Sequence, residues 1–519
     1  MKVKKKYDKV VKAWEARNFD KALELLEKVR TDEKDFYYCE AAIYAGLENV
    51  LKEYRALKKL LPLLPRSSSK EKDFYEDCLY KLNGRCSDLG LIDECLNALR
   101  YIINNTKNDR RLYDAVSNAC FNMSAKEDAS AAEFQAIYKS YSERLKVKPF
   151  PKQFYNHEKI RVGFSSADFY NHVVMKWSWA LLTKLDKNLF ETYCYSNSKE
   201  EDAVTETLRS SITGWRKIRG MTDKAAAELI RDDEIDILFD LSGHTDGHRL
   251  GVFAYRPATV QISGIGFTSS TGLKTMDYFL TDEYCVGDSA PYFVENLIAM
   301  SNTHVCYMPF AELQLQIAEE PPCLKNGYVT FGSFNQYRKI TDSMLVAWKR
   351  ILDAVPNSRL LLKHKVYGIE GAKEFVGERL ERLGIEPNRV ELRGYSDKHP
   401  LDYNDMDIAL DTFPYTGVTT TVEALLMNVP VISLYGDRHA TRCGLSILSN
   451  AGLKELAVAS YDEYVQRAVL LASDWEFLSI FRKNLRTMLM TSPIMDWNSY
   501  VREIEQAFID VLNLERTRQ

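Results

Sequence analysis

Hydrophobic positions in the first part of the chain recur with the spacing of one face of an α-helix. In residues 7–30 the apolar side chains fall three or four positions apart, and a turn at residues 17–19 separates two such runs. Asp20 stands where it can cap the second run, and a similar hairpin recurs at residues 89–91, with Asp93 ahead of the next apolar face. This periodicity predicts consecutive helical hairpins.

Residues 1–148 are therefore predicted to form an all-helical domain. Its helix pairs resemble degenerate tetratricopeptide repeats, without matching a strict repeat consensus. The segment contains no histidine. We interpret it as an arm that docks a partner protein, with a purely packing role as the alternative.

A proline-containing linker at residues 147–151 ends the helical pattern. After it, short β-rich runs alternate with amphipathic segments, which predicts a parallel sheet with crossover helices in a domain over residues 155–325. The predicted strands cover residues 160–164, 192–195, 235–241, 260–263 and 278–280.

The same alternation restarts in residues 326–519. Strands are predicted at residues 328–334, 358–363, 389–392, 408–410 and 430–434, and a last helix at 497–514 is expected to pack back on the body. The fold class is thus α/β, with two Rossmann-like, doubly wound domains behind a helical arm. Ligands of such folds bind at the carboxyl ends of the strands, so we expect a cleft between the two domains.

Composition excludes several functions. Hydrophobic residues make up 45% of the chain and charged residues 27%, as in globular proteins. The formal net charge of -4 leaves no basic excess for a general nucleic-acid binder. The basic start at residues 1–6 is not followed by an apolar run, and no run reaches the roughly 18 residues of a membrane span. We expect neither a signal peptide nor a membrane span.

The ten cysteines are scattered, and none forms a CxxC pair. We expect them to be small buried residues in a reducing, cytoplasmic protein. The same spacing argues against a cysteine-type zinc site.

All eight histidines lie after residue 156. Five of them follow predicted strands: His172, His244, His248, His399 and His439. A single histidine is most often structural or at the surface, but a set at strand carboxyl ends indicates that some line the cleft.

Residues 411–421 carry the clearest phosphate signal. A strand runs into a Pro/Gly loop and then into a helix that starts with Thr419 and Thr420. Free backbone N–H groups at a helix start suit a diphosphate, whereas the alternative is a plain threonine-capped helix. No GxxxxGK[ST] occurs, and no GxGxxG follows the first strand, so a P-loop enzyme and a dinucleotide dehydrogenase are disfavoured.

Residues 334–340 follow the first strand of the second domain. Gln336 can hydrogen-bond there, and Lys339 can carry positive charge toward a departing diphosphate, unless it is a solvated loop lysine. Acidic pairs such as Asp232 and Asp233 fall in turns, and nothing requires a metal-bridged carboxylate site.

With these segments in view, the sequence resembles the O-GlcNAc transferase/SPINDLY family of glycosyltransferases. The matching stretches are residues 161–172, 236–245, 253–258, 334–336 with Lys339, 410–417 and 439–442. Together with the flanking helices they span about residues 160 to 515 in the order and spacing of the family. The helical arm matches the family's architecture less specifically.

The resemblance implies an inverting, metal-independent enzyme of the GT-B type that transfers GlcNAc from UDP-GlcNAc to Ser or Thr hydroxyls of a protein held partly by the arm. No cofactor is implied. The candidate catalytic residues are His172, as a positioning group or a base, with His244 and Lys339. The candidate donor-binding residues are Lys339 and Thr419 and Thr420 for the phosphates, Gln336, Arg249 and His399 for the nucleotide-sugar, Glu423 for the ribose, and Arg442.

Two loops depart from the family pattern. Gly264, Phe267 and Thr268 stand where the family usually has Trp, Tyr and Pro, and Val418 is a change in the phosphate loop. Gln336 and Arg442 favour the GlcNAc-transferring branch, since the fucose-transferring branch typically has Asn at both places.

Three alternatives stay open. The donor could be GDP-fucose or UDP-glucose. The chain could be a helical-repeat adaptor with a vestigial transferase fold, for which the altered loop is the only support. A nucleotide-sugar epimerase of similar fold is disfavoured by the arm. The acceptor is not named by the sequence, and flagellin or another surface protein is one candidate.

Overall fold

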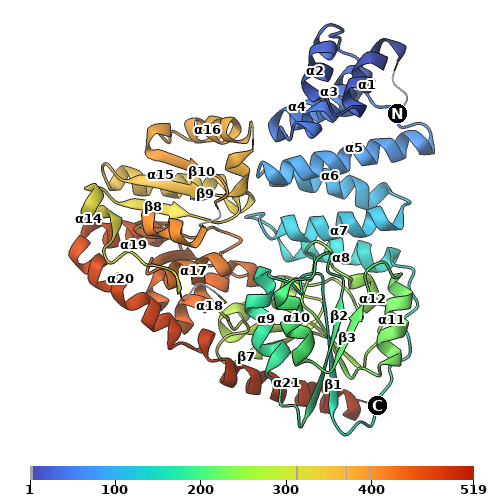
Figure 1. Cartoon of the computed structure of the whole chain (residues 1–519), viewed down its shortest axis with the longest axis vertical. Coiled ribbons are helices and arrows are strands. Elements are labelled where there is room, and N and C mark those ends of the chain that lie inside the picture. Colours follow the sequence, from blue (N-terminus) through green and yellow to red (C-terminus); the bar gives the residue numbers. More distant parts are fainter. Residues whose placement is uncertain (1–3, 311–313, 370, 397–398, 519) are drawn as a thin grey trace.

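The computed structural model describes residues 4–310, 314–369, 371–396 and 399–518. It contains a helical arm and two lobes, each built on a parallel sheet (Figure 1). The predicted fold class is confirmed.

The arm is a stack of antiparallel helices. They are α1 (Asp8–Glu15), α2 (Phe19–Glu27), α3 (Lys34–Gly46), α4 (Val50–Leu60), α5 (Ser69–Asp88), α6 (Ile92–Asn105), α7 (Asp109–Met123) and α8 (Ala131–Arg144). Capping boxes start α5 at Ser68 and α8 at Ser130, each with a glutamate three positions later. The prediction that Asp20 caps α2 is wrong. The helix already begins at Phe19, and its N-cap is Asn18, whose side chain accepts the hydrogen bond from the Lys21 N–H.

The first lobe contains a seven-stranded sheet in the order β3-β2-β1-β4-β5-β6-β7. Its strands are β1 (Ile160–Ser166), β2 (Phe190–Ser196), β3 (Gly214–Lys217), β4 (Ile237–Asp240), β5 (Val260–Ser263), β6 (Tyr278–Asp282) and β7 (Asn296–Met300). Its helices are α9 (Val173–Thr183), α10 (Ala203–Ser211), α11 (Asp223–Asp232), α12 (Leu250–Ala254) and α13 (Glu283–Val286). The sequence pattern missed β3 and β7, which are the edge strands and are only partly buried.

The second lobe contains a six-stranded sheet in the order β10-β9-β8-β11-β12-β13. Its strands are β8 (Thr330–Ser333), β9 (Arg359–Lys363), β10 (Val390–Arg393), β11 (Ile408–Leu410), β12 (Val431–Leu434) and β13 (Ala457–Val458). Its helices are α14 (Pro322–Asn326), α15 (Asp342–Ala354), α16 (Ala372–Arg382), α17 (Thr419–Leu426), α18 (Cys443–Asn450), α19 (Tyr461–Ser473) and α20 (Trp475–Met490). In both sheets the order of the strands reverses beside the first strand, between β1 and β4 and between β8 and β11, which places a ligand crevice at each of these points.

The last helix, α21 (Trp497–Thr517), returns to the first lobe (Figure 1). Its apolar face, including Ile504 and Phe508, lies in the same core as Phe164 and Phe239 of the first sheet. The predicted helix is therefore present and packs back on the body. It packs on the first sheet, although its residue range had been assigned to the second domain.

The arm is continuous with the first lobe. One hydrophobic core joins its helices to α11 and α12, and the linker is also docked, because the Phe150 N–H donates to the Tyr255 carbonyl over 2.7 Å. All ten cysteines lie within the described residues and are buried and free, as expected. Of the helices in the described ranges, none combines the length and the apolar character that crossing a membrane requires.

Candidate active site

A cavity of about 1410 Å³ lies where the two lobes and the arm meet. The first lobe contributes the loops that follow β1 and β4, and the second lobe contributes those that follow β8 and β11. Helices α5, α7 and α8 of the arm complete the wall. Of the predicted site residues, His172, His244, Arg249, Gln336, Lys339, Thr419 and Thr420 line this cavity.

Lys339 is a buried cation on the second-lobe wall. Its Nζ donates to the Thr416 carbonyl over 3.0 Å and lies 3.7 Å from the centre of the Tyr415 ring. Burial lowers the pKa of this ammonium group to about 8, although the Asp411 carboxylate opposes that change. The protein therefore keeps a poorly solvated positive charge at the cavity wall, which an anionic ligand would stabilise.

Asp411 shapes the loop between β11 and α17. Its carboxylate accepts hydrogen bonds from the Gly417 N–H at 2.7 Å and the Ser433 hydroxyl at 2.7 Å, and burial raises its pKa. A side chain at Gly417 would press on Thr420 and Thr421. This explains why a glycine stands where the loop turns into the helix.

Helix α17 begins at the cavity. Among the described residues, no side chain caps its first turn, so its leading N–H groups remain available to a ligand. The Thr419 hydroxyl accepts from the indole of Trp177 in the first lobe at 2.9 Å, and the Thr420 hydroxyl donates to Asn335 at 3.1 Å. The plain threonine-capped helix considered from the sequence is therefore not what forms.

Gln336 lies exposed at the mouth of the same wall. Its side-chain oxygen accepts two hydrogen bonds from Arg338, at 2.6 and 2.9 Å. Arg338 in turn stacks over Phe121 of the arm at 4.0 Å. Gln336 is thus oriented by a residue that the arm holds.

His172 stands on the first-lobe wall, at the start of α9. Its Nδ1 accepts the Val174 N–H over 3.3 Å, so in the neutral ring the proton is on Nε2. The nearest carboxylate, Asp168, is 3.8 Å from Nδ1, and burial raises the pKa of that carboxyl group. In this tautomer His172 offers the cavity a hydrogen-bond donor.

His244 is joined to the arm by a chain of hydrogen bonds. Its Nε2 donates to the Thr271 carbonyl at 3.0 Å, so its Nδ1 accepts from the Ser117 hydroxyl at 3.0 Å. The Ser117 oxygen then accepts from His248 Nε2 at 2.8 Å. Burial lowers the pKa of His244 to about 3 and that of His248 to about 4. Since both His244 nitrogens are occupied, the geometry does not support the predicted catalytic role and gives this residue a structural one.

Arg249 lines the cavity, but its guanidinium N–H groups donate to partners inside the first lobe. Its guanidinium bonds to Asp223 at 2.9 Å, to Asn197 at 3.3 Å, and to the Ile218 and Met221 carbonyls at 2.9 and 3.0 Å. It therefore fixes the loops around the cavity instead of presenting a free guanidinium to a nucleotide.

His399 and Glu423 form a pair beside the cavity. His399 Nε2 is 3.4 Å from the Glu423 carboxylate, and the Lys176 ammonium group is 3.6 Å from the same carboxylate. The His399 ring also packs against Phe334, which lines the cavity. The two residues are thus brought together next to the cavity wall.

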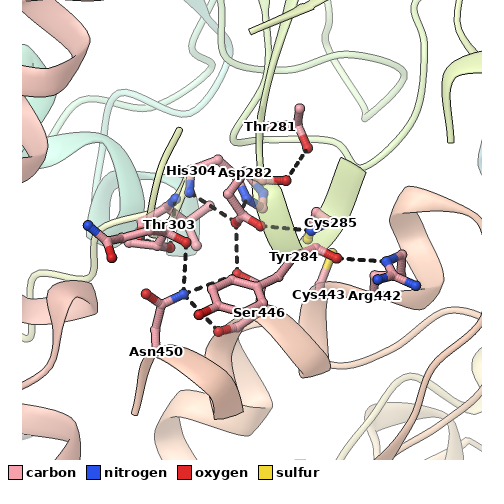
Figure 2. A network of polar contacts seen from close by, with 12 residues as sticks. Thr281, Asp282, Tyr284, Cys285, Thr303, His304, Arg442, Cys443, Ser446 and Asn450 are labelled. Atoms are coloured by element: carbon pink, nitrogen blue, oxygen red, sulfur yellow. Dashed lines mark hydrogen bonds and ion pairs between the residues drawn. The ribbon is translucent and has the colours of Figure 1, made fainter. Parts of the chain in front are cut away.

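Arg442 does not reach the cavity. Its Nε donates to the Tyr284 carbonyl of the first lobe at 2.6 Å (Figure 2). Another guanidinium nitrogen donates to the Gly436 carbonyl at 2.8 Å. The predicted donor-binding role is therefore not supported, because the guanidinium links the lobes elsewhere.

The loop that departs from the family pattern forms part of the wall. Ile265 has a φ of 68°, and a side chain at Gly266 would meet the Leu241 carbonyl at 1.8 Å, so the chain turns tightly here. Phe267 packs against Phe121 of the arm, which also contacts Tyr415 of the second lobe. Sequence reasoning missed Ser117 and Phe121, because nothing in a helical apolar repeat marks the arm residues that face a distant loop. It also missed Arg338 and Tyr415, which lie in the segments 334–340 and 411–421 but contact Phe121 of the arm only in the folded chain.

Two Rossmann-like lobes that face one cavity, with a buried lysine and an open helix start on its wall, are the arrangement of the GT-B type. The model of glycosyl transferase family 41 matches residues 140–308 and 318–504. The chain belongs to this family and is an O-GlcNAc transferase-like glycosyltransferase.

Individual relatives agree with this assignment. The probable UDP-N-acetylglucosamine–peptide N-acetylglucosaminyltransferase SPINDLY of Solanum lycopersicum is 39% identical over 355 residues, covering 67% of this chain and 38% of that protein. The SEC protein of Arabidopsis thaliana, named as a probable enzyme of the same activity, is 28% identical over 376 residues, covering 70% of this chain and 38% of that protein. The matches thus span about two fifths of the curated relatives.

A solved structure matches over nearly the whole chain. It is a lysine-to-methionine variant of the O-GlcNAc transferase of Thermobaculum terrenum, with a TM-score of 0.80 and 26% identity, covering 99% of this chain and 98% of that one. The helical arm is therefore part of the shared fold.

Proposed function

We propose that this chain transfers GlcNAc from UDP-GlcNAc to Ser or Thr hydroxyls of a protein acceptor, with inversion at the sugar. The observation that carries the proposal is the buried cation Lys339 beside the open N-terminus of α17 on one cavity wall. Relatives that carry this activity in their names add support.

The donor's diphosphate would lie against Lys339 and the first turn of α17. Departure of UDP develops negative charge on the diphosphate, and a fixed ammonium group with aligned N–H groups stabilises that charge. These groups supply positive charge from the protein itself, so we propose a reaction without a catalytic metal.

The acceptor hydroxyl would attack the sugar carbon in line with the departing diphosphate, so that one C–O bond forms as the other breaks, and the hydroxyl proton passes to a phosphate oxygen of the leaving group or to water. His172 would position the sugar or its phosphate through its Nε2–H. This role suits a donor better than a base, because a ring nitrogen that already carries a proton cannot accept one.

Fewer residues support the assignment of the donor sugar than support the assignment of the reaction class. Gln336 faces the cavity and favours GlcNAc, whereas Arg442 no longer contributes to that argument because it lies outside the cavity. GDP-fucose is therefore the second candidate donor, and UDP-glucose the third.

The acceptor would enter along the arm. Tyr80, Arg110, Tyr113 and Asn118 of α5 and α7 line the cavity, so a polypeptide on this face of the arm could present its side chain to the donor. Aromatic and arginine side chains are common anchors for such partners. The free cysteines fit the proposed cytoplasmic location.

The test is transfer by the whole chain to proteins of a host lysate with UDP-GlcNAc, UDP-glucose or GDP-fucose, read by intact mass. We expect a HexNAc mass on acceptor proteins with UDP-GlcNAc and none with Lys339→Met. A deoxyhexose mass would assign the fucose donor. If no donor gives transfer and none raises the melting temperature, the chain is an adaptor and the proposal is wrong.

A further inference from the structure

A second cluster of reactive side chains lies where α13 of the first lobe meets α18 of the second (Figure 2). Cys285 comes from α13, and Cys443 is the first residue of α18. Figure 2 shows their sulfur atoms next to one another, between the two lobes. The cluster also includes His439, His304 and Asp282. None of these residues lines the cavity described above.

Three of these side chains converge at metal-binding distance. One ligand atom each from Cys285, His439 and Cys443 lies within 4.8 Å of the other two. The corners of a tetrahedral zinc site with two sulfur and two nitrogen ligands are roughly 3.3–3.8 Å apart, given Zn–S bonds of about 2.3 Å and Zn–N bonds of about 2.0 Å. A contraction of at most about 1.3 Å would thus complete these three corners.

The His439 ring lacks a polar partner. The residue is only 2% exposed, yet neither ring nitrogen has a hydrogen-bond partner among the described residues. The rings of Phe279 and Phe293 pack against it edge to face. A buried imidazole without partners is costly, and a metal bond would satisfy one of its nitrogens.

His304 is the candidate for the fourth corner. It shares a group of ligand atoms with Cys285 but not with His439 and Cys443 together, so its ring would have to move further than the other three side chains. The Asp282 carboxylate accepts from its Nδ1 at 2.5 Å, which leaves Nε2 unprotonated in the neutral ring. Its ring centre is 5.0 Å from that of His439, and Asp282, Cys285 and His304 form a second group with ligand atoms within 4.8 Å of one another. A carboxylate behind a histidine is the arrangement that orients zinc-binding imidazoles in proteins.

We propose that Cys285, Cys443, His439 and His304 bind a structural Zn²⁺ ion that ties the two lobes together. Two thiols lose their protons to solvent as the ion enters, so two thiolates, two neutral imidazoles and Zn²⁺ make a site of zero net charge. Such a site suits an interior where all four residues are buried. A ligand set of two sulfurs and two nitrogens favours zinc over calcium or magnesium.

The ion would act on the geometry of the lobes. Cys285 and His304 belong to the first lobe, and His439 and Cys443 to the second, so the metal bonds cross the interface. Asp282 strengthens the same contact, since it also accepts from Ser446 of α18 at 2.7 Å. The inference is independent of the proposed function, because it concerns residues outside the cavity.

The experiment uses the full chain, stripped with a chelator and then given Zn²⁺ alone or Co²⁺ alone. We expect about one Zn²⁺ per chain by elemental analysis and, with Co²⁺, thiolate-to-cobalt absorption together with the visible bands of a tetrahedral ion. Zinc should raise the melting temperature and slow amide exchange in α13 and α18 at least about tenfold.

A double variant, Cys285→Ala with Cys443→Ala, should lose the zinc and the cobalt spectrum. The matched control is Cys194→Ala with Cys306→Ala, which also removes two buried thiols but lies outside the cluster. If circular dichroism shows that the control variant is folded, it should keep both the bound zinc and the cobalt spectrum.

The cobalt spectrum of the wild-type chain keeps the test decisive even if a variant fails to fold. A folded wild-type chain that takes up neither ion overturns the proposal. The proposal is also overturned if the double variant Cys285→Ala with Cys443→Ala takes up as much zinc as the wild-type chain. A chain whose mass is lower by two hydrogens, with Cys285 and Cys443 in one cross-linked peptide, would make the cluster a disulfide and also overturn it.

Discussion

Replacing Lys339 with methionine should make the ligand-free protein more stable while it abolishes transfer. The ammonium group lies in the interior, and burial lowers its pKa from the usual 10.5 to about 8. The difference corresponds to about 3 kcal/mol against the folded state at neutral pH. Methionine removes that cost but leaves the Thr416 carbonyl without its donor, at about 1 kcal/mol. We expect a net gain of about 2 kcal/mol in the free energy of unfolding.

The stability difference between wild type and the Lys339→Met variant depends on pH. A lysine whose folded pKa is lowered destabilises the fold at low pH, and the penalty disappears as the pH rises from the folded pKa of about 8 toward the unfolded value of 10.5. As the pH rises, the wild-type chain should therefore gain stability relative to the variant, although the variant stays the more stable of the two at neutral pH. The gap between the two should narrow by about 2 kcal/mol between about pH 7 and about pH 9.5.

The assay is urea unfolding of both chains at each pH, alongside transfer rates with the active donor. The rate should fall by at least about 10²-fold in the variant, since a fixed cation no longer faces the diphosphate. Lys363→Met is the control, because this second buried lysine is paired with Asp402 and its loss should destabilise the chain by about 1–3 kcal/mol. A Lys339→Met chain that is less stable than wild type at neutral pH, or one that still transfers sugar, would refute the reasoning.

Variants at three further positions, with matched controls, test the site. His172→Ala should lower kcat by about 10²-fold, and His172→Gln, which keeps a donor near Nε2, should recover about tenfold; equal losses in both with a shifted pH profile would favour a base. Ser117→Ala should cost about 2 kcal/mol by breaking the chain of hydrogen bonds between buried His244 and half-buried His248, whereas Ser124→Ala, at the C-cap of the same helix, should cost less than about 1 kcal/mol; equal losses in urea unfolding would contradict the role of that chain. Arg442→Asn should lower the melting temperature but leave the donor preference unchanged, and a switch toward GDP-fucose in the transfer assay would return Arg442 to the donor site.

Local periodicity predicted most of the elements. Ten strands were expected from runs of β-branched and aromatic residues, and each corresponds to a strand of the structure. The missed strands β3, β7 and β13 are short or partly exposed edge strands, which carry little apolar signal because one side of each faces solvent. The position of α21 was also beyond the sequence, since an amphipathic face does not say which sheet it covers.

The candidate site was predictable where chemistry follows a strand directly. Lys339, Thr419 and His172 reach the cavity because the carboxyl ends of parallel strands meet at one edge. Arg442 and His244 also follow strands, yet their side chains are taken up by partners from other parts of the chain. Whether a polar side chain stays free depends on those distant partners.

The sequence by itself determined the helices of the arm, the two parallel sheets and the loops that carry Lys339 and the threonine-rich helix start. These follow from spacing along the chain, because helix and strand periods and turn residues act over a few neighbours. The tertiary structure alone decided that the arm closes the cavity, and that Cys285 and His304 meet His439 and Cys443. The cysteine spacing argued against a zinc site, because a spacing pattern detects only ligands that lie close together in the sequence. Here the ligand pairs lie more than a hundred residues apart, and the packing of α13 against α18 brings them together.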